Sequence, residues 1–163
     1  LGLSLFKIQP KLHTRADEKS VMILFSSKEM VACVHKLGVP IGNKISQGLS
    51  IPEWIFLKNE YQQAFLRGLF DTDGCVFLDN HRIKTKLYSH MGWAVTSADP
   101  QFRRQIVSMM NHLGFRPTNR PSQKSIFLRR QADINQYFSR VGSNNKKHLV
   151  KYCAFRKKLW RGV

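Results

Sequence analysis

The stretch Phe65–Val76, FLRGLFDTDGCV, begins as an apolar helix and ends with two carboxylates, Asp71 and Asp73, just before Gly74. A helix C-terminus already carries partial negative charge, so each carboxylate there costs about 0.3–1 kcal/mol. The whole chain has 10 Asp and Glu residues. Two of them at the unfavourable end of one helix therefore indicate a functional role for the negative charge.

The rest of the composition is strongly basic. The 163 residues include 27 Lys and Arg, which gives a formal net charge of +17. A charge so one-sided favours a polyanionic partner, and nucleic acid phosphate is the commonest one. A ribosomal or chromatin-type protein without chemistry fits this charge equally well, so charge alone does not separate an enzyme from a binding protein.

The cysteines and the apolar runs exclude several other classes. Cys33, Cys75 and Cys153 lack the paired C-x-x-C spacing of a zinc site and form no disulfide framework. No apolar run approaches the roughly 18–20 residues that span a membrane, and no secretory signal is recognisable. We therefore expect an intracellular protein, in the cytoplasm or nucleoid or in an organelle.

The apolar patterning predicts a mixed α+β fold. Helical spacing and cap residues predict helices over about 26–38, 60–72, 100–114 and 132–142. Short runs between them predict strands at 3–14, 20–25, 75–80, 92–98 and twice within 115–130. The charged segment 81–90 is expected to be a turn, and 144–163 a basic tail.

Two parts of the chain resemble each other at an offset of 104 residues. Lys19-Ser20-Val21 matches Lys124-Ser125-Ile126, and each leads through a strand into a helix that ends at Gly38 or Gly142. Two amphipathic helices can agree by chance, but the shared strand and the basic loop that follows favour a true repeat. We therefore expect the tail of a first half-domain at 1–44, a linker at 45–58 and a complete second half-domain at 59–163, with the start of the first half missing.

The small residues of the acidic helix suggest a helix pair. Gly68 and Thr72 are four residues apart and share one face, and small residues at this spacing let a second helix approach closely. An incidental glycine is the plainer reading, because it costs a helix only about 1 kcal/mol. If two such helices did pack together, their carboxylates would converge and repel unless a divalent cation lay between them. Mg²⁺ suits such a site and phosphodiester chemistry.

The segment LRGLFDTDG resembles the signature motif of the LAGLIDADG homing endonucleases. The connector IPEWIF and the helix start YQQAF are typical of intron- and intein-type members of the double-motif branch, and SSKEMVACVHKLGVPIGNK and NQYFSRVGSNNKKHLVKY resemble the closing helix and loop of their half-domains. The resemblance implies an αββαββα half-domain whose saddle-shaped antiparallel sheet lies over DNA, preceded by the ββα end of a first half. Arg67 departs from the motif, which usually has a small residue there.

The resemblance also implies roles for single residues. Asp73 is similar to the metal-binding catalytic carboxylate, Asp71 to the acid that is more often structural, and the carbonyl of Gly74 or Thr72 is expected to help hold Mg²⁺. A basic residue near the cut phosphate would be Arg129 or Arg130, with Lys28 in the first half. Alternate strand residues are expected to bind DNA: Arg82, Lys84, Lys86, Thr96, Arg116, Arg120, Gln123, Lys124 and Arg129, with Lys7, Lys11, His13, Arg15 and Lys19 in the first half.

The leading hypothesis is a site-specific double-stranded DNA endonuclease, or a fragment of one, that uses Mg²⁺ to hydrolyse phosphodiesters. The alternatives are a non-cleaving relative, such as an intron-splicing maturase, and a basic structural RNA-binding protein. Asp73 favours the enzyme, because a pure binder gains nothing from a carboxylate that faces phosphates. A single motif supplies one helix of the pair, so the second is expected from a missing N-terminal segment or from a second chain.

Overall fold

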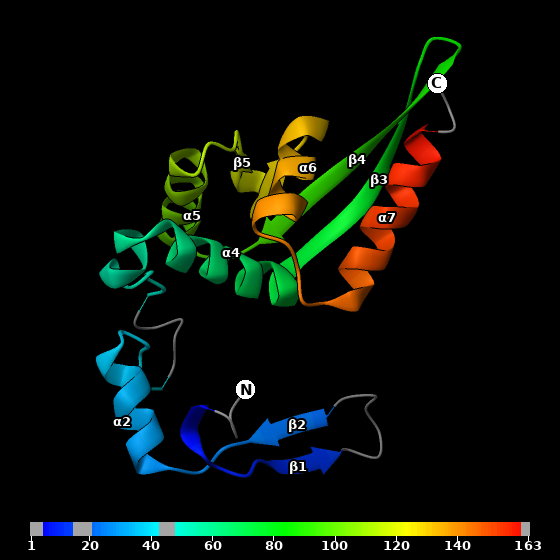
Figure 1. Ribbon diagram of the computed structural model, residues 1–163. Helices are drawn as coiled ribbons and strands as arrows, with labels where there is room; N and C mark the ends of the chain where they lie inside the picture. Colours follow the sequence, from blue (N-terminus) through cyan, green and yellow to red (C-terminus); the bar gives the residue numbers. More distant parts are fainter. Residues whose placement is uncertain (1–4, 15–20, 43–47, 161–163) are drawn as a thin grey trace. The chain divides into compact units, whose positions relative to one another are not determined.

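The computed structural model describes residues 5–14, 21–42 and 48–160 (Figure 1). Its contacts divide the chain into two compact units, Leu1–Gln47 and Gly48–Val163. Within the described ranges, no helix is long and apolar enough to cross a membrane.

The first unit is a strand pair followed by a helix. β1 (Lys11–Thr14) and β2 (Val21–Leu24) are antiparallel, and α2 (Lys28–Lys36) begins at an N-cap, Ser27, whose hydroxyl accepts a hydrogen bond from the Met30 N–H at 3.1 Å. Ser27 therefore caps the helix that was predicted over about 26–38. Apolar side chains of this unit remain exposed: Leu12, Val21, Met22, Ile23, Leu24, Val31, Leu37 and Ile41.

The second unit is built on a four-stranded antiparallel sheet of order β3-β4-β6-β5 (Figure 1). Helices precede, separate and follow its two strand pairs, which confirms the predicted α+β class and the αββαββα order. The elements are η1 (Glu53–Leu57), α4 (Asn59–Asp73), β3 (Gly74–Ile83), β4 (Lys86–Thr96), α5 (Pro100–His112), β5 (Thr118–Arg120), η2 (Pro121–Gln123), β6 (Ser125–Leu128), α6 (Gln131–Arg140) and α7 (Lys146–Trp160).

One face of this sheet forms the core with the helices. Phe70 of α4 stacks on Trp93 of β4 with ring centroids 5.1 Å apart, and Tyr137 of α6 donates a hydrogen bond to the Leu66 carbonyl at 3.1 Å. All four side chains are fully buried. Because burying one such apolar side chain contributes about 1.5–3 kcal/mol, this cluster fixes α4 across the sheet and so fixes where its acidic end lies.

The helix α5 matches its prediction closely. Asp99 is its N-cap and accepts hydrogen bonds from the N–H groups of Gln101 and Phe102, and from Leu49 N before η1. These bonds, from Phe102 first and Leu49 second, lower the pKa of Asp99 because they stabilise the ionised carboxylate. The expected apolar stripe is buried: Ile106, Met109, Met110 and Leu113.

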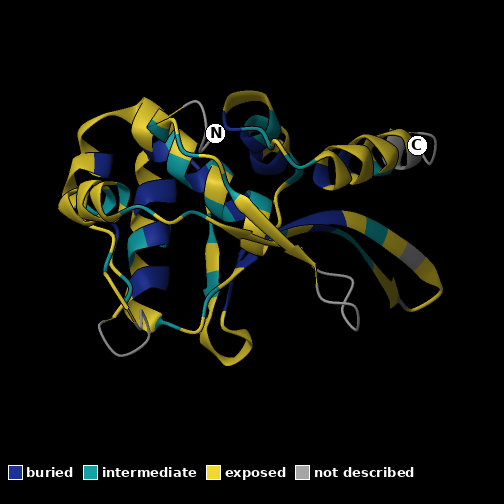
Figure 2. Cartoon of the chain, turned by 90° about the horizontal axis from the view of Figure 1, so that it is seen from below, coloured by how far each residue is buried: buried dark blue, intermediate teal, exposed yellow. Residues whose placement is uncertain are grey.

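Two expectations were wrong. The segment 81–90 is mostly strand, because β3 runs to Ile83 and β4 starts at Lys86. Cross-strand contacts extend the hairpin, including a 2.6 Å hydrogen bond from Ser89 to Asn80. Figure 2 shows this ribbon changing from buried at its base to exposed towards its tip.

The basic tail is not a tail but the helix α7. Its His148 and Tyr152 are buried, and Phe155 packs on the core from the next turn. Tyr152 also stacks on Phe138 of α6 with ring centroids 3.9 Å apart. This apolar spacing of one helix face was hidden by the surrounding lysines and arginines.

The offset of 104 residues relates secondary-structure elements as well as the residues of the sequence. β2 spans Val21–Leu24 and β6 spans Ser125–Leu128, the same positions shifted by 104. Gly38 and Gly142, which follow the two related helices, both have positive φ, 92° and 74°. The division into two half-domains at these boundaries stays a prediction.

Candidate active site and nucleic-acid interface

The two carboxylates at the end of α4 have different surroundings. The Asp71 carboxylate accepts hydrogen bonds from the Ser143 hydroxyl and from the backbone N–H groups of Asn144 and Asn145, and the Asp71 carbonyl accepts another from Asn145 Nδ2 at 3.0 Å. These groups form the loop between α6 and α7. Asp71 therefore fastens that loop to the motif helix.

Asp73 is exposed, two residues further on. Among the described residues its carboxylate has one hydrogen-bond partner, the Thr72 hydroxyl at 3.0 Å. The Thr72 hydroxyl also lies within hydrogen-bonding distance of the Gly68 and Leu69 carbonyls, at 3.3 and 3.1 Å. Asp73 thus keeps acceptor capacity for a ligand that approaches from outside.

Gly74 is required for close packing rather than for an unusual backbone angle. Its φ is −95°, which any residue adopts. A Cβ at this position would lie 2.2 Å from Phe70 Cδ2 and 2.4 Å from the Phe70 carbonyl oxygen. The glycine therefore lets β3 leave the helix directly over Phe70, with the Asp73 side chain on the outside.

Arg67, the departure from the family motif, has a structural partner. Its Nε donates a hydrogen bond of 2.7 Å to the carbonyl of Val141 at the end of α6. A cation at a helix C-terminus is stabilising, and this one satisfies a terminal carbonyl. Arg67 therefore joins α4 to α6, a role that the sequence did not predict.

The remaining face of α4 is open. Gly68 and Thr72 are exposed, as is Ala64 one turn earlier. A Cβ at Gly68 would meet no described atom within 4 Å. Trp54 and Leu57 are exposed large apolar side chains just before the helix. Small exposed residues on one face of a helix allow close approach of another backbone.

Basic residues of α7 begin directly after the loop that Asp71 holds. Lys146 and Lys147 are exposed there, and the Lys147 N–H donates to Asn145 Oδ1 at 3.1 Å. Burial raises the pKa of Cys75, and the charge of Lys151 opposes that rise, which places Lys151 close to the start of β3. Sequence reasoning assigned these cations no role in the site, because the segment was expected to be a basic tail.

His148 lies in the same region and is 7 % exposed. Its ring centroid is 4.8 Å from that of Phe70. Burial lowers the pKa of His148. A hydrogen bond to the Asp71 backbone and the charge of the Asp71 carboxylate oppose this lowering, while Lys147 and Lys151 add to it. The neutral imidazole is therefore the form that packs against the motif helix.

The sheet face opposite the helices carries part of the expected DNA-binding set. The register places Lys86, Thr96 and Arg120 on this open face, together with Phe77 and Phe127. Lys84 is exposed in the β3–β4 turn, and Arg116 just before β5. Gln123 and Lys124 are exposed in the β5–β6 turn. The Ser97 N–H donates to the Lys124 carbonyl at 2.9 Å, which places this turn at the end of β4. That is also the end of the sheet where α4 stops, because Gly74 pairs with Val95 of β4.

Arg82 was assigned to the wrong face. It shares its side of β3 with Val76, Leu78 and Asn80, because successive strand residues alternate. Val76 is buried in the core, so that side faces the helices. The odd-numbered residues of β3 lie on the open face of the sheet with Lys86. Arg82 has an even number and therefore lies on the face that the helices cover.

Arg129 is on the open face but is not near Asp73. β6 pairs Leu128 with Trp93, and β4 pairs Trp93 with Val76, so Arg129 lies abreast of the β3 residues beyond Val76. At about 3.3 Å per residue along a strand and about 4.8 Å between strands, its backbone lies roughly 15 Å from that of Asp73. Arg130 is exposed at the N-cap of α6. The structure therefore does not bring either arginine to the acidic end of α4.

In the first unit, the described basic residues are exposed: Lys7, Lys11, His13 and Lys28. Arg15 and Lys19 lie outside the described residues. No element of that unit carries a carboxylate at a position like that of Asp73 within the described ranges. DNA binding by Lys7, Lys11 and His13, and a place for Lys28 near the cut phosphate, stay predictions.

The expected metal ion needs donor atoms from the chain itself. The described residues contain no group of three or more His, Cys, Asp or Glu placed to hold a metal ion. Mg²⁺ does not need such a group, because it is commonly bound by one or two carboxylates with phosphate oxygens and water. The exposed carboxylate of Asp73 and the adjacent carbonyl of Gly74 fit that donor set.

The chain is similar to parts of several known proteins. A segment of 69 residues is 40% identical to the replication factor C small subunit of Methanocaldococcus jannaschii. This segment makes up 41% of this chain and 4% of that protein. The crystal structure of the I-LtrWI LAGLIDADG homing endonuclease bound to target DNA is similar at 15% identity and a TM-score of 0.46, over 64% of this chain and 39% of that one. The crystal structure of the I-SmaMI LAGLIDADG homing endonuclease bound to cleaved DNA is similar at 15% identity and a TM-score of 0.44, over 78% of this chain and 42% of that one. The matched part of the chain thus spans less than half the length of each of these proteins.

A family model described as the LAGLIDADG-like domain matches residues 60–154, which include the motif helix, the whole sheet and most of α7. The match covers more than half of the chain. This chain therefore belongs to the LAGLIDADG-like domain family.

Proposed function

We propose that this chain is all or part of a site-specific double-stranded DNA endonuclease that hydrolyses phosphodiesters with the help of a divalent cation. The proposal rests on the different surroundings of the two acids at the end of α4, Asp71 and Asp73. Asp71 is occupied by the α6–α7 loop, whereas Asp73 is exposed and, among the residues that the structure describes, hydrogen-bonded only to the Thr72 hydroxyl. A carboxylate left open in a chain of net charge +17 suits a cation and a phosphate better than it suits stability.

The proposed roles follow from position. Asp73 and the Gly74 carbonyl would hold Mg²⁺, which when bound supplies positive charge that stabilises the attacking and leaving oxygens of a phosphodiester displacement. Lys146 and Lys147 at the start of α7 place positive charge near this end of α4. The open sheet face binds the duplex through its cations, which fix its position on the phosphates.

A second motif helix would complete the site. The exposed face at Gly68 and Thr72 is suited to close packing against another such helix, from a second copy or from another segment of a longer protein. Encoding within an intron or an intein, and a location inside the cell or an organelle, belong to this proposal as well.

The test is cleavage of a randomised duplex library by the intact protein with Mg²⁺ and with EDTA. We expect metal-dependent cutting that falls by more than about 100-fold in Asp73→Asn, the scale of losing a group that stabilises transition-state charge. Glu60→Gln is the matched control, because it removes an exposed acid from the other end of the same helix. Its cutting should equal that of the wild type.

Each outcome separates one reading from another. Equal cutting by Asp73→Asn would reject the site, and the absence of metal-dependent cutting would reject the endonuclease. Sequence-selective binding without cutting would instead support a non-cleaving relative. A salt series measures the phosphate contacts, since duplex affinity should fall steeply as salt rises.

A further inference from the structure

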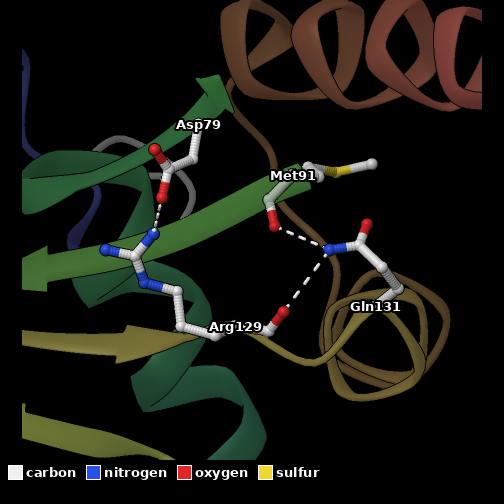
Figure 3. Close-up of polar contacts among 4 residues, drawn as sticks. All are labelled: Asp79, Met91, Arg129 and Gln131. Atoms are coloured by element: carbon white, nitrogen blue, oxygen red, sulfur yellow. Dashed lines mark hydrogen bonds and ion pairs between the residues drawn. The ribbon is translucent and has the colours of Figure 1, made fainter. Parts of the chain in front are cut away.

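Asp79 and Arg129 form an ion pair on the open face of the sheet (Figure 3). Arg129 Nη1 lies 2.5 Å from Asp79 Oδ2, and the two side chains are 38% and 41% exposed. A carboxylate on this face is unexpected, since it repels the phosphates that the surrounding cations attract. An acid in such a place needs a purpose other than affinity.

The guanidinium of Arg129 also rests on two aromatic rings. Its Cζ is 5.3 Å from the ring centroid of Phe77 and 4.8 Å from that of Phe127, within the range of cation–π attraction. The two rings meet edge to face with centroids 6.3 Å apart. Arg129 thus has a carboxylate at one edge and an aromatic support beneath it.

Gly92 of β4 makes this support possible. It lies opposite Phe77 in the register, and a Cβ there would come within 2.3 Å of Phe77 Cζ. The Phe77 ring therefore lies across the bare backbone of β4, towards Phe127 on β6. A side chain at position 92 would push the ring out of this place.

The backbone of Arg129 is held as well. Gln131 Nε2 donates to the Met91 carbonyl at 2.8 Å and lies 3.4 Å from the Arg129 carbonyl (Figure 3). The start of α6 is thereby tied to β4 beside Arg129. An arginine held by its backbone, by two rings and by a carboxylate loses little side-chain entropy when it binds a ligand.

We propose that Arg129 reads a guanine in the major groove of the target duplex and that Asp79 is the positioning residue that orients it. The proposal rests on the DNA binding of the proposed function. The arginine fork matches guanine O6 and N7, and this pair is the commonest specific contact to a base. A β-ribbon is narrow enough to enter the major groove.

The local charges favour base readout over a phosphate contact. The affinity of a cation for phosphate depends on its charge, which a paired carboxylate offsets. Discrimination between bases depends instead on a fixed orientation of the side chain, which the same carboxylate provides. The distance of Arg129 from Asp73 along and across the sheet argues against a role at the cut phosphate. The same pair of residues thus gives specificity at some cost in general affinity.

The experiment is selection of bound duplexes from a randomised pool, followed by sequencing, with the 163-residue chain and no divalent cation. Arg129→Lys keeps the charge but lacks the fork. We expect it to lose a guanine preference at one position by about 5- to 100-fold, the discrimination of one bidentate contact. The salt dependence and the affinity for unrelated duplexes should stay unchanged.

Two further variants test the support of Arg129. Asp79→Asn should weaken the guanine preference at the same position while leaving or raising the affinity for unrelated duplexes. Gly92→Ala should weaken it as well, because it displaces the Phe77 ring. Arg104→Lys is the control for a conservative change, since Arg104 is exposed on α5 of the helix-covered side, and its profile should match the wild type.

The outcomes that overturn the inference differ from those that overturn the proposed function. Uniform weakening across all sequences by Arg129→Lys would show a phosphate contact, and an unchanged profile would show no role in readout. Either result rejects the inference and leaves the endonuclease standing. Failure of the wild-type chain to bind any duplex would reject both, whereas a guanine preference in a protein that does not cleave would support the inference alone.

Discussion

Asp71 and Asn145 are joined twice. The Asp71 carboxylate accepts the Asn145 backbone N–H at 3.3 Å, and the Asp71 carbonyl accepts Asn145 Nδ2 at 3.0 Å. The side-chain bond satisfies a carbonyl at the helix C-terminus, where intrahelical partners run out. This pair fixes the start of α7 beside the acidic end of α4, so the first acid of the motif is an organiser of the site.

Replacement of Asp71 should therefore destabilise the fold. Asp71→Ala leaves the N–H groups of Asn144 and Asn145 and the Ser143 hydroxyl without their acceptor. Hydrogen bonds to a charged group contribute about 1.5–3 kcal/mol each before relaxation and solvation by water, so we expect a loss of about 2–3 kcal/mol in the free energy of unfolding. Urea titration measures it as a lower midpoint with an unchanged slope.

Asp73→Asn is the opposite case on the same helix end. It removes an exposed negative charge from a helix C-terminus, so the free energy of unfolding should stay level or rise by about 0.3–1 kcal/mol. The two variants together separate the roles of the acids. A loss for Asp73→Asn as large as that for Asp71→Ala would contradict this division.

Replacement of Gly68 should raise the stability of the chain and weaken the packing of a second helix. A Cβ there meets no described atom within 4 Å, so Gly68→Ala should stabilise the chain by up to about 1 kcal/mol through helix propensity. The same methyl group would keep a second motif helix from close approach, so cleavage by the complete protein should fall.

The control for this prediction is Gly114→Ala. Gly114 also has open space around it, but its φ is +86°, a conformation that costs an L-residue about 1–2 kcal/mol. Urea midpoints should therefore move up for Gly68→Ala and down for Gly114→Ala. Cleavage at the wild-type rate by a stabilised Gly68→Ala protein would rule out close pairing at this face.

The lysines at the start of α7 should matter more for cleavage than Arg130 does. The joint change of Lys146 and Lys147 to Gln removes two charges beside the loop that Asp71 holds at the end of α4. We expect a fall in cleavage rate of at least about 10-fold with duplex binding largely kept. Arg130→Gln removes one charge from the N-cap of α6, away from the acidic end. A larger effect at Arg130 than at the lysines would restore the arginine prediction.

The motif helix and the α+β order could be predicted because their signals are local. Ser27, Asp99 and the apolar stripe of α5 each mark a helix within a few residues. The role of Asp71 could not be read in this way, because its partners are more than seventy residues away in sequence. The face of Arg82 depends on where the alternation of β3 starts, and a shift of one residue exchanges the faces.

The helix α7 shows a second reason why sequence reasoning fell short. Lysines and arginines cover most of its surface, so the buried line of His148, Tyr152 and Phe155 is narrow and the segment has a polar average. Packing against Phe70 and Phe138, rather than intrinsic periodicity, defines that helix. Tertiary contacts of this kind decide secondary structure when the local signal is weak.

His148 should make the stability of the protein depend on pH. Its pKa is lowered in the fold because burial disfavours the charged imidazole, with Lys147 and Lys151 adding to the effect and Asp71 opposing it. The unfolded state therefore binds a proton first, near pH 6.5, so stability is complete above about pH 6.5 and falls as the pH drops towards the folded-state pKa. Urea midpoints at pH 7.5 and 5.5 should show this fall in the wild type and a smaller one in His148→Gln. His112→Gln, at an exposed position in the last turn of α5, should keep the wild-type fall, and an equal fall in all three proteins would show that His148 is not its source.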